Sequence, residues 1–405
     1  MTRQKKKSFQ NVRDPVTRGL ARRMFGQHEE AIADYGEAIR LAPDNADAWL
    51  YRGLAKGSLG RYEAAIADYD EAIRLAPDNA ESWLHRGIAR GNLGRHEEAI
   101  ADYGEALRLA PDNADTWLYR GLAGGSLGRY EAAIADCDEA IRLAPDNAGA
   151  WLNRGAAGEN LGRYEAAIAD YDEVINLEPD NTLARLRRGL IRESLGRYEA
   201  AIADFDKVID LEPDNAEAWL NRGFSRGQLG EHGEAIADFD KVIDLEPDNA
   251  EAWFHRGFFN GNLGRHEAAI ADCDEAIRLE PDNAGAWLNR GASRKSLGRY
   301  KEAMADYDEA VRLAPENAVM WFNRGVTRRE LEQYEAAIAD FDEVIRLQPE
   351  KAGAWLRRGD CKESLGRRGE AMADARRALS LARQQGDTEL AETAQGFLAD
   401  LEGTA

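Results

Sequence analysis

Cysteine is scarce in this chain of 405 residues, which contains only Cys137, Cys273 and Cys361. The three lie far apart in the sequence, and no Cys-x-x-Cys pair is present. An odd, scattered set of cysteines is typical of a reducing compartment and of packing in a protein core, rather than of disulfides or metal sites. We therefore expect a cytoplasmic protein with buried thiols and no metal.

Long apolar runs are also lacking, and positively charged residues are fewer than negatively charged ones. No apolar run approaches the roughly 18 residues of a membrane span, and the first ten residues, MTRQKKKSFQ, lack the apolar core of a signal peptide. Lys and Arg number 53 against 74 Asp and Glu, so the net charge is −21. Proteins that bind DNA or RNA gain much of their affinity by neutralising phosphates. The composition therefore argues against nucleic-acid and membrane partners.

Catalytic motifs are absent as well. The sequence has no Gly-rich loop of the spacing that cradles phosphates, no His-Glu-x-x-His and no Gly-x-Ser-x-Gly. Its six histidines fall at two positions of a repeat: His28, His96, His232 and His266 at one, His85 and His255 at the other. Packing explains the first four better than ligand binding. We predict a protein that is not an enzyme, with no catalytic residue and no cofactor.

Repetition is what the chain has in abundance. A segment of 34 residues, seen at 46–79 as ADAWLYRGLAKGSLGRYEAAIADYDEAIRLAPDN, occurs eleven times from residue 12 to residue 385 without an insertion. In this frame Trp49 is position 4, Gly53 position 8, Ala65 position 20 and Pro77 position 32. The tryptophan recurs at 83, 117, 151, 219, 253, 287, 321 and 355. A fixed period of this length indicates a solenoid, in which stacked repeats share one core.

The repeat resembles the tetratricopeptide repeat (TPR). The residues that match its pattern of large, small and proline positions are Trp49, Gly53, Gly60, Tyr62, Ala65, Tyr69, Ala72 and Pro77. The resemblance implies an all-α fold, a right-handed superhelical solenoid of eleven helix-turn-helix repeats. The residues support two helices independently, because apolar side chains recur at helical spacing in each half of the repeat. Gly60 separates the halves, Pro77 ends the second helix, and Asn79 offers an N-cap for the next.

Two positions carry opposite charges in all eleven repeats, Arg at position 7 and Asp at position 23. Arg is unusual at position 7, where the family has an apolar residue. The aspartates are an invariant row, which indicates a structural role rather than paired catalytic carboxylates. We therefore expect Arg52 and Asp68, and their equivalents, to form a repeated ion pair. Glycine at position 12 of five repeats is expected to loosen the first helices.

The ends and the middle of the array depart from this pattern. Residues 1–11 are a basic tail, residues 12–385 the array of repeats, and residues 386–405 a C-terminal helix and tail expected to cap the last repeat. Pro15 replaces tryptophan in the first repeat, which predicts a short first helix. Arg185 replaces it in the sixth, where we expect weaker packing, a guanidinium that reaches water or a carboxylate, and a joint in the array.

Positions 2 and 6 vary between repeats, and in the family they face the concave groove. The resemblance therefore implies a partner-binding set at position 6, namely Tyr51, His85, Tyr119, Asn153, Arg187, Asn221, His255, Asn289, Asn323 and Arg357. It adds an acidic set at position 2, namely Asp47, Glu81, Asp115, Glu217 and Glu251. Apolar residues at position 9 and Ser or Asn at position 13 complete the groove.

The asparagines at position 6 resemble, incompletely, the ladder that holds a peptide backbone in the repeats of O-linked N-acetylglucosamine transferase; an amide can both donate and accept. The alternative is that they are soluble fillers. The carboxylate clamp of co-chaperones needs Asn at position 9, which is mostly apolar here. We predict a non-enzymatic scaffold that binds a peptide or helical segment of another protein. The alternatives are a sensor or regulatory subunit that gates a partner enzyme, and a self-associating module.

Overall fold

The computed structural model describes residues 13–403 and is all-α, with 23 helices and no strand in that range. The predicted basic tail, residues 1–11, lies outside the described residues. The chain divides into two compact units, Met1–Leu195 and Gly196–Ala405, and the boundary falls inside the sixth repeat. Within each unit, the two helices of a repeat pack on each other and on the next repeat. The prediction of an all-α repeat solenoid is confirmed.

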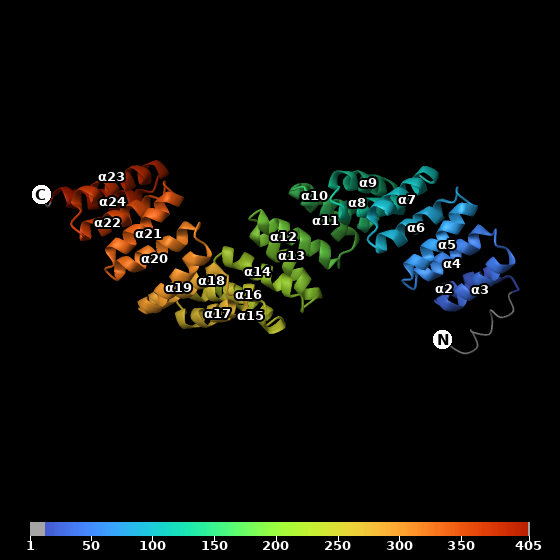
Figure 1. Ribbon diagram of the computed structural model, residues 1–405, viewed down its shortest axis with the longest axis horizontal. Helices are drawn as coiled ribbons and strands as arrows, with labels where there is room; N and C mark the ends of the chain where they lie inside the picture. The colour runs from blue at the N-terminus through green and yellow to red at the C-terminus, as the bar shows by residue number, and fades with distance from the viewer. Residues whose placement is uncertain (1–12, 404–405) are drawn as a thin grey trace. The chain divides into compact units, whose positions relative to one another are not determined.

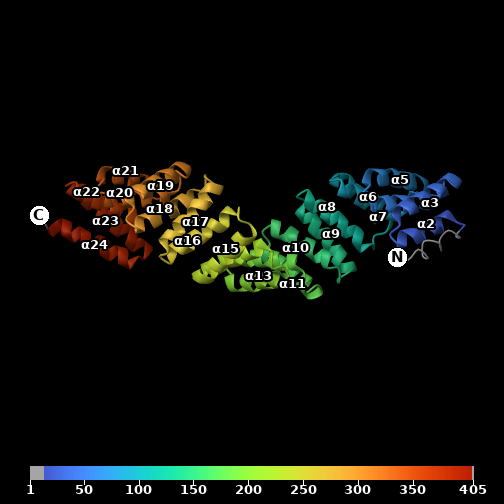
Figure 2. The same cartoon turned by 90° about the horizontal axis from the view of Figure 1, so that it is seen from below.

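The helices follow in chain order, as the colours of Figures 1 and 2 show. Those of the N-terminal unit are α2 (Pro15–Met24), α3 (His28–Leu41), α4 (Ala46–Gly57), α5 (Tyr62–Leu75), α6 (Ala80–Asn92), α7 (His96–Leu109), α8 (Ala114–Ser126), α9 (Tyr130–Leu143), α10 (Ala148–Asn160), α11 (Tyr164–Leu177) and α12 (Thr182–Ser194). Those of the C-terminal unit are α13 (Tyr198–Leu211), α14 (Ala216–Gln228), α15 (His232–Leu245), α16 (Ala250–Asn262), α17 (His266–Leu279), α18 (Ala284–Ser296), α19 (Tyr300–Leu313), α20 (Ala318–Glu330), α21 (Tyr334–Leu347), α22 (Ala352–Ser364), α23 (Arg368–Gln385) and α24 (Thr388–Gly403).

The helices begin and end where the repeat predicts. Asn79 is the N-cap of α6, and its side-chain oxygen accepts a hydrogen bond from the Ser82 backbone N–H. Gly60, between α4 and α5, has a φ of 71°, a left-handed conformation that glycine adopts without strain. In the tenth repeat Glu332 takes this place with a φ of 59°. The loop geometry is therefore the same even where glycine is missing.

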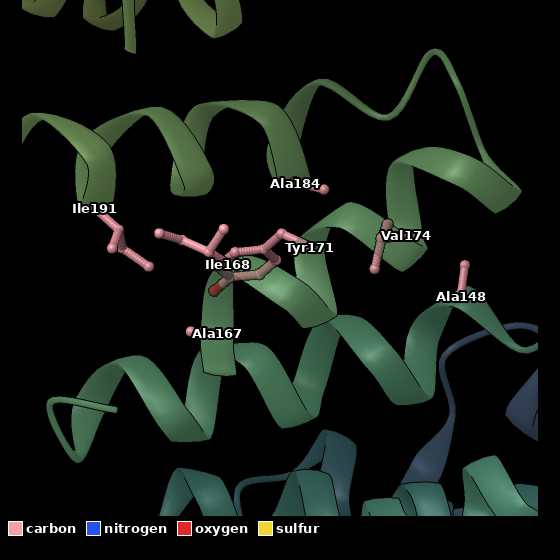
Figure 3. Packing of buried hydrophobic residues seen from close by; sticks show 7 residues of the cluster. All are labelled: Ala148, Ala167, Ile168, Tyr171, Val174, Ala184 and Ile191. Atoms are coloured by element: carbon pink, nitrogen blue, oxygen red, sulfur yellow. The ribbon is translucent and has the colours of Figure 1, made fainter. Parts of the chain in front are cut away.

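The core of the array lies between neighbouring helices rather than at one centre. In Figure 3, Ile168, Tyr171 and Val174 of α11 lie between α10 and α12, and Ala184 and Ile191 of α12 face them. Tyr171, Val174 and Ala184 have no exposed surface. Each second helix thus completes its core only when the next repeat is in place, as expected for helices too short to be stable alone.

Glycine at position 8 allows the two helices of a repeat to approach closely. A Cβ atom built on Gly53 would lie 2.6 Å from Cε1 of Tyr69, the aromatic residue at position 24. No ordinary contact is that short, so any larger residue would push α4 away from α5. The same approach occurs at Gly87, where the distance to Cε1 of Tyr103 is 2.6 Å.

The predicted ion pair is present. An oxygen of Asp68 lies 2.6 Å from Nη2 of Arg52, and a second bond of 2.9 Å joins Arg52 Nε to the other oxygen. In the ten repeats that lie within one unit, the closest distance between Arg at position 7 and Asp at position 23 is 2.5 to 2.8 Å. The aspartates are buried, so the pairs form inside the stack.

Two contacts that the sequence did not predict enlarge this ion pair. In most repeats the residue at position 11 adds a second donor to the same aspartate, as Lys56 does to Asp68 at 2.7 Å. At eight junctions the arginine in turn reaches Asp at position 25 of the preceding repeat, as Arg86 does to Asp70 at 2.6 Å. Because the second contact crosses the junction between repeats, the ladder joins neighbours as well as the two helices of one repeat.

The tryptophan at position 4 packs under this network. The guanidinium carbon of Arg52 lies 4.7 Å from the ring centroid of Trp49, whose indole N–H donates to the Pro43 carbonyl at 3.0 Å. The guanidinium of Arg185 also has a partner that the sequence did not predict, because its Nη2 donates to the Pro179 carbonyl at 2.9 Å. Arg185 therefore takes over the hydrogen bond that tryptophan makes in other repeats.

The lengths of the helices at the two ends of the array depend on where proline is present or absent. Pro15 is the first residue of α2, which has only 10 residues, as predicted. The last repeat has no proline at position 32, and α23 continues to Gln385 over 18 residues. Helix α24 then packs on α23, where Leu401 joins a cluster with Ala371 and Ala375. This contact supports the proposal that the C-terminal segment caps the array.

The three cysteines are reduced and buried. Burial raises the pKa of the Cys137, Cys273 and Cys361 thiols to about 12, so almost no reactive thiolate forms near neutral pH. We expect iodoacetamide at pH 8 to leave the native protein unlabelled and to label three thiols after unfolding in guanidinium, as mass spectrometry would count. A native protein that reacts rapidly at one of these thiols would contradict the burial described here.

Candidate functional site: a groove along the first helices

The described surface is hollowed along the first helices of three successive repeats in the N-terminal unit. One hollow of about 480 Å³ lies between α6 and α8, and includes Glu81, His85, Ile88, Asp115 and Tyr119. It adjoins a hollow of about 220 Å³, which shares Ile88 and Tyr119. A third, of about 290 Å³, lies between α8 and α10 and shares Leu122 with the second. We call this surface the α6–α8–α10 groove.

The groove has an apolar interior and a polar margin. Ile88 and Leu122 at position 9 and Tyr119 at position 6 supply apolar surface, and Leu122 is 39% exposed. Glu81 and Asp115 at position 2 supply negative charge. An exposed apolar strip with charged edges is the kind of surface on which an amphipathic segment binds. The structure thus brings together part of the predicted set: Glu81, His85, Asp115, Tyr119 and Asn153.

His85 and Glu81 form a pair one turn apart on α6. Nε2 of His85 lies 3.6 Å from Oε1 of Glu81, and the interaction with His85 lowers the pKa of the Glu81 carboxyl. The ring of His85 stacks on Tyr69, with centroids 6.3 Å apart. His255 repeats this arrangement with Glu251 at 3.6 Å and with Phe239 at 5.6 Å. Each of these histidine rings is thus positioned by stacking on an aromatic ring.

The asparagines at position 6 differ from a ladder of free amides. The amides of Asn153, Asn221 and Asn323 donate to backbone carbonyls four residues earlier in their own helices, at 2.6, 2.7 and 2.9 Å. One donor of each amide is therefore occupied, although the oxygen stays available. The Nδ2 atom of Asn289 is buried without a hydrogen-bond partner.

A single hollow of about 280 Å³ in the C-terminal unit contains two of these asparagines, Asn289 and Asn323, together with Phe258. Asn221 and Glu217 lie outside it. The remaining predicted residues also lie apart from the hollows. Asp47 and Arg357 are on the surface, and Tyr51 packs against Tyr35 with centroids 5.9 Å apart.

Arg187 has a partner within the chain. Its Nη1 lies 3.5 Å from Oε1 of Glu159 on α10, and its side chain is half exposed. Glu159 in turn accepts a hydrogen bond of 2.9 Å from the Tyr171 hydroxyl. The guanidinium is therefore partly neutralised, which makes Arg187 a weaker partner for an anionic group than an unpaired arginine would be.

Sequence reasoning assigned position 17 to core packing, but this position also contributes to the hollows. His96 and Tyr130 line the groove in the N-terminal unit, and His266 lines the hollow in the C-terminal unit. Nδ1 of His266 is nevertheless buried, which agrees with packing. Position 17 is Tyr or His in the first ten repeats and Arg in the last, and this variation was the available signal.

Comparison with protein families identifies the repeat. Models described as tetratricopeptide repeat match residues 84–148, 126–182 and 322–394, and residues 216–249, 250–283 and 284–317. A model described as TPR repeat matches residues 19–59, 55–94 and 189–230. The chain is a tetratricopeptide repeat protein. TPR repeats are in general a non-catalytic fold for protein interaction. No curated protein matches the chain.

Solved TPR structures share the fold. The Cut9–Hcn1 hetero-tetramer of APC/C matches with a TM-score of 0.51 and 15% identity, over 95% of each chain. Yeast Tom70 matches with a TM-score of 0.43 and 16% identity, over 96% of this chain and 95% of that one. YrrB, described as a TPR protein with an unusual peptide-binding site, matches with a TM-score of 0.41 and 23% identity, over 45% of this chain and 95% of its own. At 15% identity, the likeness to Cut9–Hcn1 shows the fold alone.

Two kinds of feature are absent from the described residues of this TPR protein. Between residues 13 and 403, no helix is both long enough and apolar enough to cross a membrane. Over the same residues, no group of three or more His, Cys, Asp or Glu side chains is arranged to hold a metal ion.

Proposed function

We propose that this TPR protein is a scaffold that binds a peptide or helical segment of another protein in the α6–α8–α10 groove. The observation that carries the proposal is the continuity of three hollows along successive first helices, with Ile88 and Leu122 inside and acidic residues at the margin. A continuous apolar strip suits a segment several residues long better than a small molecule, which would fill one enclosed pocket.

The charge of the margin indicates the partner's chemistry. Glu81 and Asp115 border the largest of the three hollows of the groove, and the whole chain carries a net charge of −21. A segment with apolar side chains on one face and Lys or Arg on the other would complement both parts of the groove. The same net charge disfavours a nucleic-acid partner.

We also propose that the chain has no catalytic activity of its own and works in the cytoplasm. The aspartates at position 23 are occupied by ion pairs, and the thiols are buried with a raised pKa, so neither is placed to act as a base or nucleophile. Free, buried thiols suit a reducing compartment.

Substitutions at two leucines with nearly equal exposed fractions test whether the groove is the binding site. Peptides are first selected from a displayed library for binding to the native protein. Leu122→Glu is then expected to lower the affinity of groove-binding peptides at least tenfold, about 1.4 kcal/mol, because it places a charge in the apolar interior. Isothermal titration calorimetry measures the change.

Leu127→Glu is the matched control. Leu127 is 38% exposed, compared with 39% for Leu122, but it lines none of the three hollows. Its substitution adds the same charge and is expected to change affinity less than twofold. If both variants bind equally well, or both lose affinity equally, the groove is not the binding site.

A further inference from the structure

The position-25 aspartate that joins neighbouring repeats is missing at two junctions. At eight junctions, Arg at position 7 donates from Nη1 to this aspartate of the preceding repeat. Glycine occupies position 25 in the first and third repeats, as Gly36 and Gly104. Arg52 and Arg120 keep their bonds to Asp68 and Asp136, but each lacks the second carboxylate.

The place of the missing side chain at Gly36 is open. The atom nearest to a Cβ built on Gly36 is Nη1 of Arg52, at 4.0 Å. At the equivalent junction in the next repeat, Nη1 of Arg86 donates to Asp70 at 2.6 Å. Because equivalent junctions of the repeat hold an aspartate here, a carboxylate fits at this point and contacts the free edge of the guanidinium.

The charges around Gly36 favour an anion. Arg52 and Lys56 together share only one carboxylate, that of Asp68, so one positive charge is in excess. Arg40 lies one turn beyond Gly36 on α3 and has no ion pair among the described residues, because Glu37 pairs instead with Arg18 at 2.6 Å. In other repeats the equivalent arginine is held by glutamate, as Arg74 is by Glu71 at 2.8 Å.

We propose that the opening over Gly36 is a binding site for an acidic side chain of a partner protein. Arg52 is the main hydrogen-bond donor to that side chain, and Arg40 lies beside it. The space that glycine leaves is that of the aspartate side chain found at the other junctions. A carboxylate suits this site better than a phosphate dianion. Asp68 binds the same guanidinium, and it repels the double negative charge of phosphate more strongly than the single charge of a carboxylate. The site is separate from the α6–α8–α10 groove, whose hollows include neither Gly36 nor Arg52.

Gly104 and Arg120 form a weaker site of the same kind. Position 11 of that repeat is Gly124, so Arg120 and Asp136 already balance each other without a further cation. Arg108, one turn beyond Gly104, is held by Glu105 at 2.8 Å. The ligand's carboxylate therefore meets an excess positive charge at Gly36 and none at Gly104, which sets the order of the two affinities.

The experiment follows the arginine side-chain N–H signals by NMR while N-acetyl-aspartate amide replaces chloride at constant ionic strength. We expect a saturable shift at Arg52, a shift at Arg120 with at least threefold weaker affinity, and no saturable shift at Arg86. Gly36→Asp supplies the missing carboxylate within the chain and is expected to abolish the Arg52 shift. Gly36→Ala adds a methyl group only and is expected to keep the affinity within twofold.

A reverse substitution makes the test sharper. Asp70→Gly removes the inter-repeat partner of Arg86 and is expected to create a saturable shift there. The proposal is overturned if Arg52 and Arg86 respond alike in the native protein, or if the Arg52 response survives in Gly36→Asp. Inorganic phosphate that binds at Arg52 as tightly as the aspartate derivative would overturn the assignment to a carboxylate. Equal binding by N-acetyl-alanine would overturn the preference for a side chain over a chain terminus.

Discussion

Replacing Asp68 by alanine is expected to lower the free energy of unfolding by about 3–5 kcal/mol. The Asp68 side chain is 3% exposed and pairs with Arg52 at 2.6 Å and Lys56 at 2.7 Å. Removing the carboxylate would leave two partly buried cations without their anion, and the cost of desolvating them would no longer be offset. Chemical denaturation monitored by tryptophan fluorescence measures the change.

Asp70→Ala is the matched control for this result. Asp70 lies two residues away on the same helix and also pairs with an arginine at 2.6 Å, but its side chain is 50% exposed. An exposed pair contributes about 1 kcal/mol or less. A similar loss for the two variants would show that burial does not determine the strength of the ladder, and an unchanged midpoint for Asp68→Ala would show that the ladder adds no stability.

The second large effect is expected at Gly227, where alanine should destabilise the protein by about 1–3 kcal/mol. A Cβ atom on Gly227 would lie 2.0 Å from Cζ of Phe259, the buried residue that α16 packs against α14. Phe259 itself lies between Phe239 at 5.9 Å and His232 at 5.2 Å, measured between ring centroids, so it has little room to move. Thermal or chemical denaturation measures the loss.

Gly125 occupies the same position 12 and is expected to respond in the opposite direction. No atom lies within 4 Å of a Cβ built there, so alanine should stabilise α8 by about 0.5–1 kcal/mol through its higher helix propensity. Hydrogen exchange should show greater protection of α8 in Gly125→Ala. Destabilisation by Gly125→Ala, or tolerance of Gly227→Ala, would contradict this difference between the two glycines.

These two glycines show that the repeat pattern alone does not predict packing between repeats. The repeat predicted the same loosening effect for every glycine at position 12, and for Gly227 that interpretation is incomplete. Phe259 belongs to the following repeat, and nothing in the sequence around Gly227 indicates that a ring fills the space beside it. Only packing between repeats shows that this glycine is needed for contact.

The same holds for the groove. The resemblance placed fifteen residues of positions 2 and 6 on one face, and the hollows of the N-terminal unit include Glu81, His85, Asp115, Tyr119 and Asn153 from that set. Arg187, however, meets Glu159 at 3.5 Å, a contact between residues 28 positions apart that no local pattern predicts. Position within a repeat indicates the face of a helix, whereas the partner of a long side chain depends on which residue the next repeat presents.

The sequence by itself determined the helices, their boundaries and the ion pair that recurs within the repeats of each unit, because a period of 34 residues repeats the same local preferences eleven times. The tertiary structure alone decided how the ladder crosses from one repeat to the next, where Arg185 finds its acceptor, and which junctions leave an arginine edge open. These features depend on distances between side chains of different repeats, and such distances are set when helices pack, not by the spacing of residues along the chain.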